Sequence, residues 1–267
     1  MHAPSLAPAC ALHWPTDSLR AALAPHAPGI GVQAVAQIDS TNTELMRRAR
    51  DGQTAPALLV AETQTAGRGR LGRAWQGSGA GGMLSFSLGL PLAPRDWSGL
   101  SLAVGLALAD ALHPDIRIKW PNDLWWQGRK LAGILIETAA APGLTDGARY
   151  VVIGVGINLH TPAGEGFATP PAGVHEFAPD LLAPALLQRL AEPLLGAVRV
   201  FEYGGFGPLQ APFAARDALA GRAIALSDGT EGTALGIGAD GALRLRTTDG
   251  ALREITSADI SVRPAAP

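Results

Sequence analysis

The chain has 267 residues, of which 47% are hydrophobic and 16% are charged, and its formal net charge is -2 at pH 7. These values are typical of a folded globular protein, and they argue against a disordered chain and against a protein that coats nucleic acid. Residues 1–30 are interrupted by prolines, and no apolar run of about eighteen residues occurs, so we expect a cytoplasmic protein with no signal peptide and no membrane span.

The first part of the chain shows alternating helix and strand patterns. Thr41 and Glu44 have the spacing of a capping box, and Ser98 is a candidate cap for a leucine-rich helix. Ser85 and Ser87 alternate with large apolar residues, which predicts a strand in a sheet with one covered face. In chain order, the expected elements are a short helix at 17–24, a strand at 31–38, a helix that starts near 41, strands at 58–62 and 84–90, a helix up to 112, a strand at 116–120, a hairpin of 124–127 and 130–137 that turns at Gly128-Arg129, and a strand at 150–157.

The pattern changes after Leu159. A Pro- and Gly-rich loop precedes a leucine-rich helix at 181–200, which Asp180 can cap. From Gly221 onward, short strands are separated by Asp-Gly dipeptides, which are turn residues of β-hairpins, so we expect a small β-barrel-like domain. The boundary of this domain is expected near Ala220.

Lysine occurs at only two positions, Lys119 and Lys130, and the remaining 19 of the 21 basic residues are arginines. A lysine ammonium is a compact charge on a flexible stem, whereas arginine presents a planar fork, so lysines kept in an arginine-rich chain indicate a site that needs point charges. The alternatives are an outward side chain for Lys119 and a plain hairpin residue for Lys130. Since both flank the turn sequence Pro121-Asn122-Asp123, we favour a pocket that neutralises a polyphosphate.

A second cluster of positive charge lies in the glycine-rich segment 67–75, which contains Arg68, Arg70 and Arg73 before Trp75. Glycines allow the backbone to approach an anion closely, and arginine forks match phosphate and carboxylate oxygens. The segment also matches the dinucleotide pattern GxGxxG, but no helix pattern and no acidic residue follow at the required spacing. A flexible surface loop and a contact to single-stranded nucleic acid are the alternatives.

Metal and disulfide patterns are not expected in this sequence. The six histidines are scattered, and Cys10 is the only cysteine, so neither a zinc motif nor an internal disulfide is predicted. No metal-ligating residues are therefore proposed from the sequence.

Five short motifs follow one another along the chain. They are Ser40-Thr41-Asn42; Gln64 with Gly67-Arg68-Gly69-Arg70 and Gly72-Arg73-Ala74-Trp75; Lys119-Trp120-Pro121-Asn122-Asp123-Leu124; Arg129-Lys130-Leu131-Ala132-Gly133-Ile134-Leu135; and Gly154-Val155-Gly156-Ile157-Asn158-Leu159. In this order they resemble the motif set of the biotin protein ligases. The resemblance is strong over residues 36–160 and looser over the last fifty residues, which resemble that family's SH3-like C-terminal domain.

The resemblance implies a fold and an activity. The implied fold is α+β, with a mixed or antiparallel sheet and helices on one side, as in class II synthetases, and a small C-terminal SH3-like barrel. The implied domains are a leader at 1–30, a catalytic domain that binds biotin and ATP at 31–219, and a C-terminal domain at 220–267. The implied reaction joins biotin and ATP into biotinyl-5′-AMP and then transfers biotin to a lysine of a biotin carboxyl carrier domain, with Mg²⁺ accompanying ATP.

The resemblance also assigns roles to individual residues. The implied biotin-binding residues are Ser40, Thr41, Asn42, Gln64, Arg68, Gly69, Arg70, Lys130 and Gly133. The implied ATP-binding residues are Arg70, Arg73, Trp75, Lys119, Asn122 and Asn158. The implied catalytic residues are Lys130, Arg68 and Asp123. Asp123 is the candidate for orienting or deprotonating the incoming amine, and a structural role in the turn is its alternative.

Two rival functions follow from the same motifs. A lipoate ligase or related acyltransferase shares this fold class, but an octanoyl transferase needs a cysteine nucleophile, and Cys10 lies in the leader. A non-catalytic module that binds biotin or a nucleotide is the second rival. Larger members of the family carry an N-terminal DNA-binding domain, which the leader is too short to form, so we expect no DNA binding, no membrane partner and a monomer or homodimer.

Overall fold

The structure, a computed structural model, describes residues 11–75, 81–145, 147–256 and 262–264, so Cys10 lies outside the described residues. The chain forms two compact units, and each is described by itself. The first unit comprises residues 1–93 and 131–192, and the second comprises residues 94–130 and 193–267. Among the helices of the described segments, none is long and apolar enough to cross a membrane.

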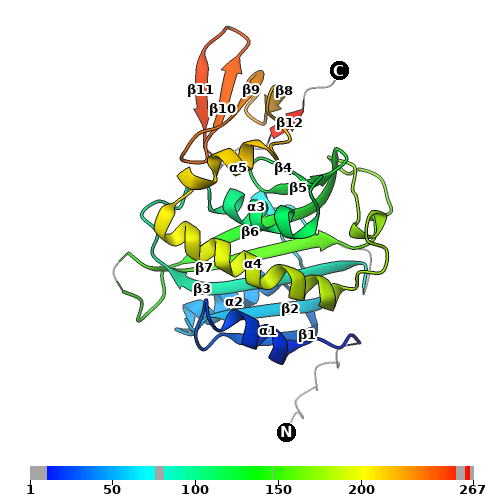
Figure 1. The fold of residues 1–267 in the computed structure, drawn as a ribbon, viewed down its shortest axis with the longest axis vertical. Helices are drawn as coiled ribbons and strands as arrows, with labels where there is room; N and C mark the ends of the chain where they lie inside the picture. The colour runs from blue at the N-terminus through cyan, green and yellow to red at the C-terminus, as the bar shows by residue number, and fades with distance from the viewer. Residues whose placement is uncertain (1–10, 76–80, 146, 257–261, 265–267) are drawn as a thin grey trace. The chain divides into compact units, whose positions relative to one another are not determined.

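The first unit is built on a mixed sheet with the strand order β1-β2-β3-β7-β6 (Figure 1). β1 and β2 are parallel, whereas the other neighbours pair antiparallel, so the expected α+β class is confirmed. The strands are β1 (Gly31–Ile38), β2 (Ala57–Gln64), β3 (Met83–Leu92), β6 (Arg129–Ala139) and β7 (Arg149–Asn158). These bounds contain every strand that the sequence predicts for this region.

The central strand β3 is buried on both faces, so the prediction of one covered face is wrong. Ser85 is 2% exposed and Ser87 is 0% exposed, although their alternation with leucine and phenylalanine suggested a solvent-facing side. Ser87 faces a buried polar network, and Ser85 is buried without a hydrogen-bond partner for its hydroxyl among the described residues. In this strand, the small polar residues that alternate with apolar ones therefore face a second buried layer and not solvent.

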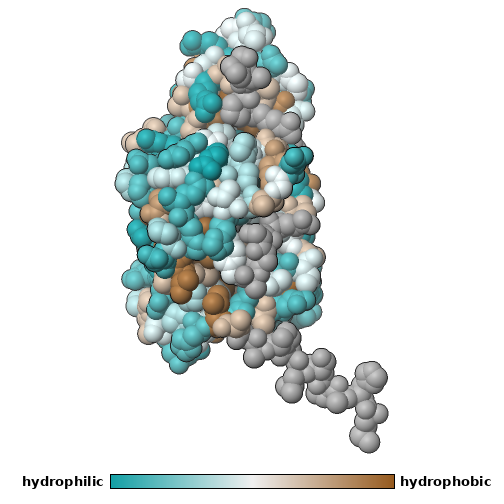
Figure 2. Space-filling model, turned by 90° about the vertical axis from the view of Figure 1, so that its right-hand side faces the viewer, coloured by the Kyte–Doolittle hydropathy of each residue, from teal (hydrophilic) through white to brown (hydrophobic). Residues whose placement is uncertain are grey.

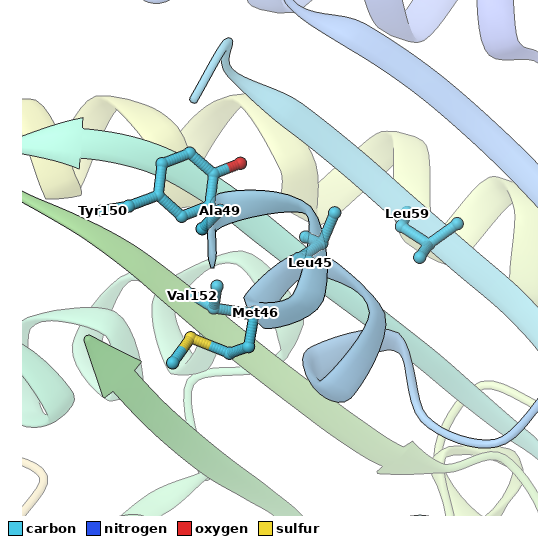
Figure 3. Close-up of a cluster of buried hydrophobic side chains, with 6 residues drawn as sticks. All are labelled: Leu45, Met46, Ala49, Leu59, Tyr150 and Val152. Atoms are coloured by element: carbon cyan, nitrogen blue, oxygen red, sulfur yellow. The ribbon is translucent and has the colours of Figure 1, made fainter. Parts of the chain in front are cut away.

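Helix α2 (Thr41–Arg50) packs its apolar side on this sheet (Figure 3). Its N-cap is Ser40, whose Oγ accepts a hydrogen bond of 3.4 Å from the backbone N–H of Thr43, so the predicted cap at Thr41 is displaced by one residue. Thr41 does not serve as the cap, because its hydroxyl lies among the side chains of Gln64 and Ser87. The buried cluster beneath the helix consists of Leu45, Met46, Ala49, Leu59, Tyr150 and Val152.

Tyr150 gives this cluster a dependence on alkaline pH. Burial raises the pKa of Tyr150 to about 12 from 10.0, and its hydroxyl donates a hydrogen bond to the carbonyl of Ala55. A raised pKa in the folded state means that the stabilisation is complete below pH 10 and is lost as the pH rises towards 12. Ionisation thus favours the unfolded chain in that window.

We expect the stability difference between the parent and Tyr150→Phe to shrink by on the order of 1 kcal/mol between pH 9 and pH 11, because only the parent has this proton to lose. Urea unfolding at several pH values measures that difference, and other titrating groups cancel in the comparison. A difference that stays constant across the window would contradict a buried, neutral Tyr150.

The opposite face of β2 holds the N-terminal segment. Glu62 accepts hydrogen bonds from the backbone N–H groups of Ala11 and Leu12, at 2.9 and 2.7 Å, and from Nε1 of Trp14 at 3.1 Å. The predicted leader helix follows as α1 (Thr16–Leu23), whose Leu19 and Leu23 are buried. Helix α1 packs against β1, and Trp14, Ala27 and Ile30 are buried as well, so the segment 14–30 contributes side chains to the core.

The second unit contains α3 (Leu100–Leu112), β4 (Arg117–Lys119), β5 (Asp123–Trp126) and α5 (Gln210–Ala214). Gly99, with φ of 81°, caps α3, so the prediction of Ser98 is wrong by one residue. Gly99 is required there because a Cβ would lie 2.6 Å from Cβ of Phe206. The hairpin turn lies at Gln127 and Gly128, which both have positive φ, one residue before the predicted Gly128-Arg129.

Helix α4 (Ala183–Gly204) contributes residues to both units, because the chain passes from the first unit to the second between Glu192 and Pro193. The expected helix at 181–200 is confirmed with shifted ends.

Large exposed hydrophobic side chains are scattered, and on the face shown in Figure 2 brown residues form only small groups.

The predicted C-terminal strands are confirmed as a five-stranded antiparallel sheet in the order β11-β10-β9-β8-β12. In each predicted Asp-Gly turn the glycine has positive φ, and the aspartate accepts a hydrogen bond from the backbone N–H two residues later. The strands are β8 (Ala223–Leu226), β9 (Glu231–Ile237), β10 (Leu243–Thr247), β11 (Leu252–Ile255) and β12 (Val262–Pro264).

Candidate functional site

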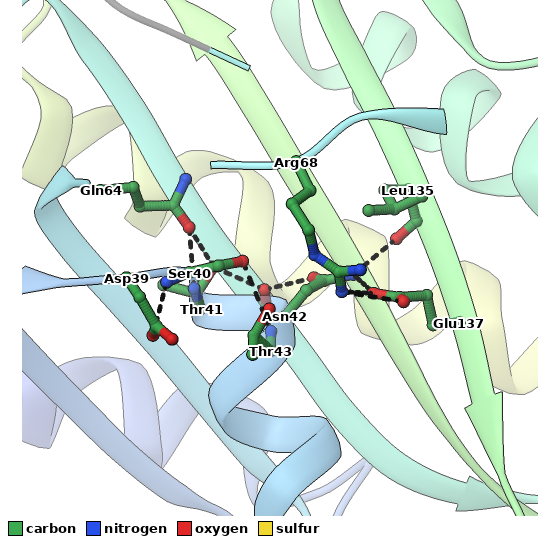
Figure 4. A network of polar contacts seen from close by, with 10 residues as sticks. Asp39, Ser40, Thr41, Asn42, Thr43, Gln64, Arg68, Leu135 and Glu137 are labelled. Carbon is green, nitrogen blue, oxygen red and sulfur yellow. Dashed lines mark hydrogen bonds and ion pairs between the residues drawn. The ribbon is translucent and has the colours of Figure 1, made fainter. Parts of the chain in front are cut away.

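A chain of hydrogen bonds connects the start of α2 with β2 and β3 (Figure 4). Oε1 of Gln64 accepts from the backbone N–H of Thr41 at 2.7 Å and lies 3.1 Å from its hydroxyl. The Ser87 hydroxyl lies 2.7 Å from Thr41 Oγ1 and 2.6 Å from Asn42 Oδ1. Because Thr41, Asn42 and Ser87 are at most 4% exposed, these contacts are shielded from competing water.

The chain continues from Asn42 to a charged pair. Nδ2 of Asn42 donates to Oε2 of Glu137 at 2.9 Å and to the carbonyl of Leu135 at 3.2 Å. An Arg68 amino group lies 2.9 Å from each Glu137 carboxylate oxygen. We call the connected set Gln64, Thr41, Ser87, Asn42, Glu137 and Arg68 the polar network.

Two glycines of β7 leave the room that this network needs. A Cβ on Gly154 would lie 2.1 Å from Asn42 Oδ1, and a Cβ on Gly156 would lie 2.1 Å from Nε1 of Trp75. Real Cβ atoms do not approach so closely, so any larger residue must displace Asn42 or Trp75. The Gly154-Val155-Gly156 motif is thereby explained by close packing.

Trp75 lies over a row of small residues that crosses four strands. Ala61 of β2 pairs with Ser85 of β3, Ser85 pairs with Gly156 of β7, and Gly156 pairs with Gly133 of β6. Paired residues face the same side of a sheet, so the row forms a floor without large side chains. Ser85 Oγ is buried there and has no hydrogen-bond partner among the described residues.

The arginine-rich segment folds back on itself as a small hairpin. Trp75 N–H donates to the carbonyl of Gly67 at 2.9 Å, and Gly69 N–H donates to the carbonyl of Arg73 at 2.7 Å. The tip is a 3₁₀ turn, η1 (Arg70–Gly72), in which Leu71 has φ of 56° and is 52% exposed. We call residues 67–75 the arginine hairpin.

An acidic residue next to the network is held in its charged form. Burial opposes ionisation of Asp39, but the Ser40 backbone N–H and the Arg47 guanidinium outweigh burial and lower the pKa of Asp39 below its ordinary value. Arg47 also pairs with Glu44. Asp39 therefore fixes the turn that leads into Ser40 and α2.

The two lysines lie together in the second unit, around one carboxylate. Nζ of Lys130 is 2.7 Å from one Asp123 oxygen, and Nζ of Lys119 is 3.9 Å from the other. Lys119 and Asp123 are cross-strand partners in β4 and β5, and each is 8% exposed. Two ammonium groups lie beside one carboxylate, and the formal charges of Lys119, Asp123 and Lys130, which we call the lysine cluster, sum to +1, a sign that suits an anionic ligand.

The segment that carries Lys119 is braced by other parts of the second unit. The indole N–H of Trp120 donates to the carbonyl of Gly241 at 3.0 Å, and Trp120 is 1% exposed. Arg216 donates to the carbonyls of His113, Pro114 and Ile116 just before β4. The C-terminal sheet, through Gly241, thus holds the residue next to Lys119.

Trp120→Phe is expected to lower the free energy of unfolding by about 2–4 kcal/mol, because it leaves the buried carbonyl of Gly241 without a donor and opens a cavity. Trp125→Phe is the matched control: Trp125 is 3% exposed, and its Nε1 has no partner among the described residues. Chemical denaturation measures both variants. Equal losses would contradict a stabilising Trp120–Gly241 bond.

The structure groups most of the predicted site residues in these two clusters. Thr41, Asn42, Gln64 and Arg68 meet in the polar network, and Ser40 caps the helix above it. Asn158 instead lies at the end of β7, where its Nδ2 donates to the carbonyl of Ala172 at 3.1 Å. Gly133 belongs to the floor of small residues, and Gly69, Arg70 and Arg73 belong to the arginine hairpin.

Sequence reasoning missed Ser85, Ser87 and Glu137. The serines interrupt an otherwise apolar strand, and Glu137 ends the apolar run of β6, so unexpected polar residues in strands were the available signal. That signal alone does not reveal which residues from other strands face them.

The chain resembles known proteins in both sequence and structure. Residues 34–158 match the Biotin/lipoate A/B protein ligase family, and residues 221–263 match the Biotin protein ligase C terminal domain. The bifunctional ligase/repressor BirA of Escherichia coli is 35% identical over 251 residues, which cover 89% of this chain and 75% of that protein. The chain belongs to the biotin protein ligase family.

Two further matches agree with membership of the biotin protein ligase family. The biotin–[acetyl-CoA-carboxylase] ligase of Paracoccus denitrificans is 38% identical over 237 residues, which cover 79% of this chain and 92% of that protein. The biotin protein ligase of Aquifex aeolicus in complex with biotin and ATP has a TM-score of 0.72 and 26% identity, and the match covers 88% of this chain and 99% of that one. The family resemblance found in the motifs is confirmed.

Proposed function

We propose that this chain is an ATP-dependent biotin–protein ligase that forms biotinyl-5′-AMP and transfers biotin to a lysine of a carrier domain. The observation that carries the proposal is the lysine cluster. The ammonium groups of Lys119, which is buried, and of Lys130, which is partly exposed, lie beside the same Asp123 carboxylate. Such a cluster can receive the biotin carboxylate and an ATP phosphate, two anions that repel each other in water. Family membership selects biotin rather than another acid.

Residues of the first unit are proposed to bind the ureido and thiophane rings of biotin. Gln64 uses Oε1 for Thr41, which leaves its Nε2 without an acceptor among the described residues, so Nε2 can donate to a ureido carbonyl. Beside Trp75, which lies over Gly156, the small residues Ala61, Ser85 and Gly133 place no large side chain where a flat ring system would lie. Ser40, Thr41 and Asn42 complete this proposed biotin site.

Residues of the lysine cluster and the arginine hairpin are proposed to bind the anionic groups. Lys130 holds the biotin carboxylate and the α-phosphate, and Lys119 with Asn122 binds the nucleotide phosphates. Gly69, Arg70 and Arg73 close over the adenylate, Trp75 stacks on the adenine, and Asn158 contacts the nucleotide. Closure excludes water from a mixed anhydride that water would hydrolyse.

The proposed reaction has two steps. In the first, a carboxylate oxygen of biotin attacks the α-phosphorus of ATP, an O–P bond forms, and pyrophosphate leaves with the electron pair of the broken bond. In the second, the carrier lysine amine attacks the acyl carbon, an amide forms, and AMP leaves. Asp123 is proposed to orient this amine and accept its proton, while positioning alone contributes about 7–11 kcal/mol to such reactions.

Magnesium is proposed to arrive with ATP. The described residues contain no group of three or more His, Cys, Asp or Glu side chains arranged to hold a metal ion, and the Asp123 carboxylate is already paired with Lys130. Mg²⁺ commonly keeps few protein ligands and binds through phosphate oxygens. The ion would offset the charge of the phosphates while Lys130 aligns them.

The remaining expectations are proposals of the same kind. The catalytic domain would comprise residues 31–219 and the small domain residues 220–267, with residues 1–30 as a leader. The partner would be the carrier domain of a carboxylase, met in the cytoplasm. Lipoate ligation is the second candidate, since the family matched over residues 34–158 includes lipoate ligases.

Incubation of the purified chain with biotin, MgATP and a purified biotin carboxyl carrier domain tests the transfer step. Intact-mass spectrometry should show one biotinyl group on the carrier domain, and none on a domain whose acceptor lysine is replaced by arginine. An unmodified carrier domain in the presence of folded ligase would refute the proposal.

A further inference from the structure

Glu137 is a charged residue that none of the predicted roles includes, although it touches two of the predicted substrate-binding residues. It lies on β6, seven positions after Lys130, and its side chain is 25% exposed. Its carboxylate accepts from Nδ2 of Asn42 and from the Arg68 guanidinium, each at 2.9 Å. Figure 4 shows Arg68 and Asn42 converging on this carboxylate from different segments.

Glu137 determines which way the Asn42 amide points. Glu137 and the carbonyl of Leu135 only accept hydrogen bonds, so the Asn42 atom that faces them must be the donor Nδ2. Oδ1 of Asn42 then faces Ser87, whose hydroxyl must donate to it. A flipped amide would place an oxygen against two acceptors, at the cost of both bonds.

The fixed direction is passed along the polar network. Since the single Ser87 proton is committed to Asn42, Ser87 Oγ can only accept from Thr41. Thr41 N–H in turn requires that Gln64 present Oε1 to it, which directs Gln64 Nε2 away from Thr41. The Gln64 amide is thus set by the Thr41 backbone, whereas Glu137 sets the direction of the Asn42 amide and, through it, of the Ser87 and Thr41 hydroxyls.

The other contact of the Glu137 carboxylate, with Arg68, is to the arginine hairpin. Arg68 is the second residue of the hairpin and forms a bridge with Ala74 on its other strand. Trp75 N–H closes the hairpin on the carbonyl of Gly67. The Arg68–Glu137 ion pair thus ties the base of the hairpin to β6, while Arg70 and Arg73 lie nearer its tip.

We propose that Glu137 is a positioning residue of this ligase, which orients the Asn42 amide and, through it, the Ser87 and Thr41 hydroxyls, and which anchors the arginine hairpin through Arg68. The inference rests on the proposed function and deepens it, because it assigns Arg68 to the anchor and leaves Arg70 and Arg73 to neutralise the substrate. Glu137 touches no reacting atom in this account. Its loss therefore acts on substrate binding before it acts on the chemical step.

Glu137→Gln tests the proposal, since glutamine keeps the size of the side chain but turns an amino group toward Arg68 or Asn42. We expect KM for biotin to rise about 10- to 100-fold, the loss typical of a hydrogen bond to a charged group. The kcat for pyrophosphate exchange should stay within about threefold of the parent. A parent-like KM, or a fall in kcat at unchanged KM, would overturn the proposal.

Glu44→Gln is the matched control, because Glu44 also pairs with arginines, Arg47 and Arg48, but lies outside the polar network. Its KM and kcat should remain parental. Arg68→Ala and the double variant Arg68→Ala/Glu137→Gln measure the coupling of the two residues. If Glu137 acts through Arg68 as well as through Asn42, the double variant raises KM by less than the product of the single effects. Effects that multiply fully would show that Glu137 does not act through Arg68.

A readout without biotin separates this inference from the proposed function. Limited trypsin digestion of the ligand-free chain, followed by mass spectrometry, reports cleavage after Arg68, Arg70 and Arg73. We expect Glu137→Gln to be cut there several-fold faster than the parent and than Glu44→Gln. Equal rates would refute the anchor even if the parent is an active ligase, and faster cleavage would support it even if the parent activates no biotin.

Discussion

Lys130→Ala is expected to lower kcat for biotin-dependent pyrophosphate exchange by about 10²–10³-fold, the usual loss when one group that stabilises developing charge is removed. Lys130 supplies one of two ammonium groups beside Asp123. Lys119 remains 3.9 Å from the same carboxylate, so Asp123 is not left without a counter-charge and the fold should persist. The thermal midpoint should accordingly change much less than the activity.

Two companion variants make this prediction specific. Lys130→Arg should also lose more than tenfold, because a broad, planar guanidinium does not replace a compact ammonium. Arg129→Ala removes the neighbouring cation and should stay within a few-fold of the parent. Lys130→Ala with activity within a few-fold of the parent would refute the role of the lysine cluster.

Gly154→Ala is expected to raise KM for biotin at least tenfold and to lower the free energy of unfolding by about 1–3 kcal/mol. Its new Cβ would lie 2.1 Å from Asn42 Oδ1, a distance that requires Asn42 to move. Movement of Asn42 breaks the bonds to Ser87 and Glu137 on which the orientation of the polar network depends. Loss of affinity and loss of stability therefore have one cause.

Gly31→Ala is the matched control for this substitution. Gly31 is also a strand residue, in β1, but the nearest atom to its new Cβ would be the carbonyl oxygen of Pro56 at 4.0 Å. Its KM and stability should remain close to those of the parent, as measured by steady-state kinetics and urea unfolding. Equal KM and equal stability of the two variants would contradict a role for the close contact between Gly154 and Asn42.

Local patterns predicted the elements well because each pattern reflects a local cause. The Asp-Gly turns, the strand at 31–38 and the leader helix were found where the periodicity and turn residues indicated them. The helix caps were displaced by one residue for nonlocal reasons: Thr41 bonds to Gln64, and Gly99 packs against Phe206. No feature of the neighbouring sequence carries that information.

The candidate site was predictable only in part. The scarcity of lysine marked Lys119 and Lys130, and the structure brings both to Asp123. The partnership of Arg68 with Glu137 was not predictable, because it joins residues 69 positions apart through strand pairing. The two-sided burial of β3 was missed for the same reason, since Ser87 acquires its polar partners, and Ser85 its cover, only in the folded sheet.

ATP–pyrophosphate exchange by the purified chain, with biotin, lipoate or octanoate supplied separately, tests the central claim most directly. The account predicts exchange with biotin alone, and its loss in Lys130→Ala. Exchange with lipoate or octanoate but not with biotin would assign the chain to a different acid, and no exchange by a folded chain would contradict the proposal that it activates biotin.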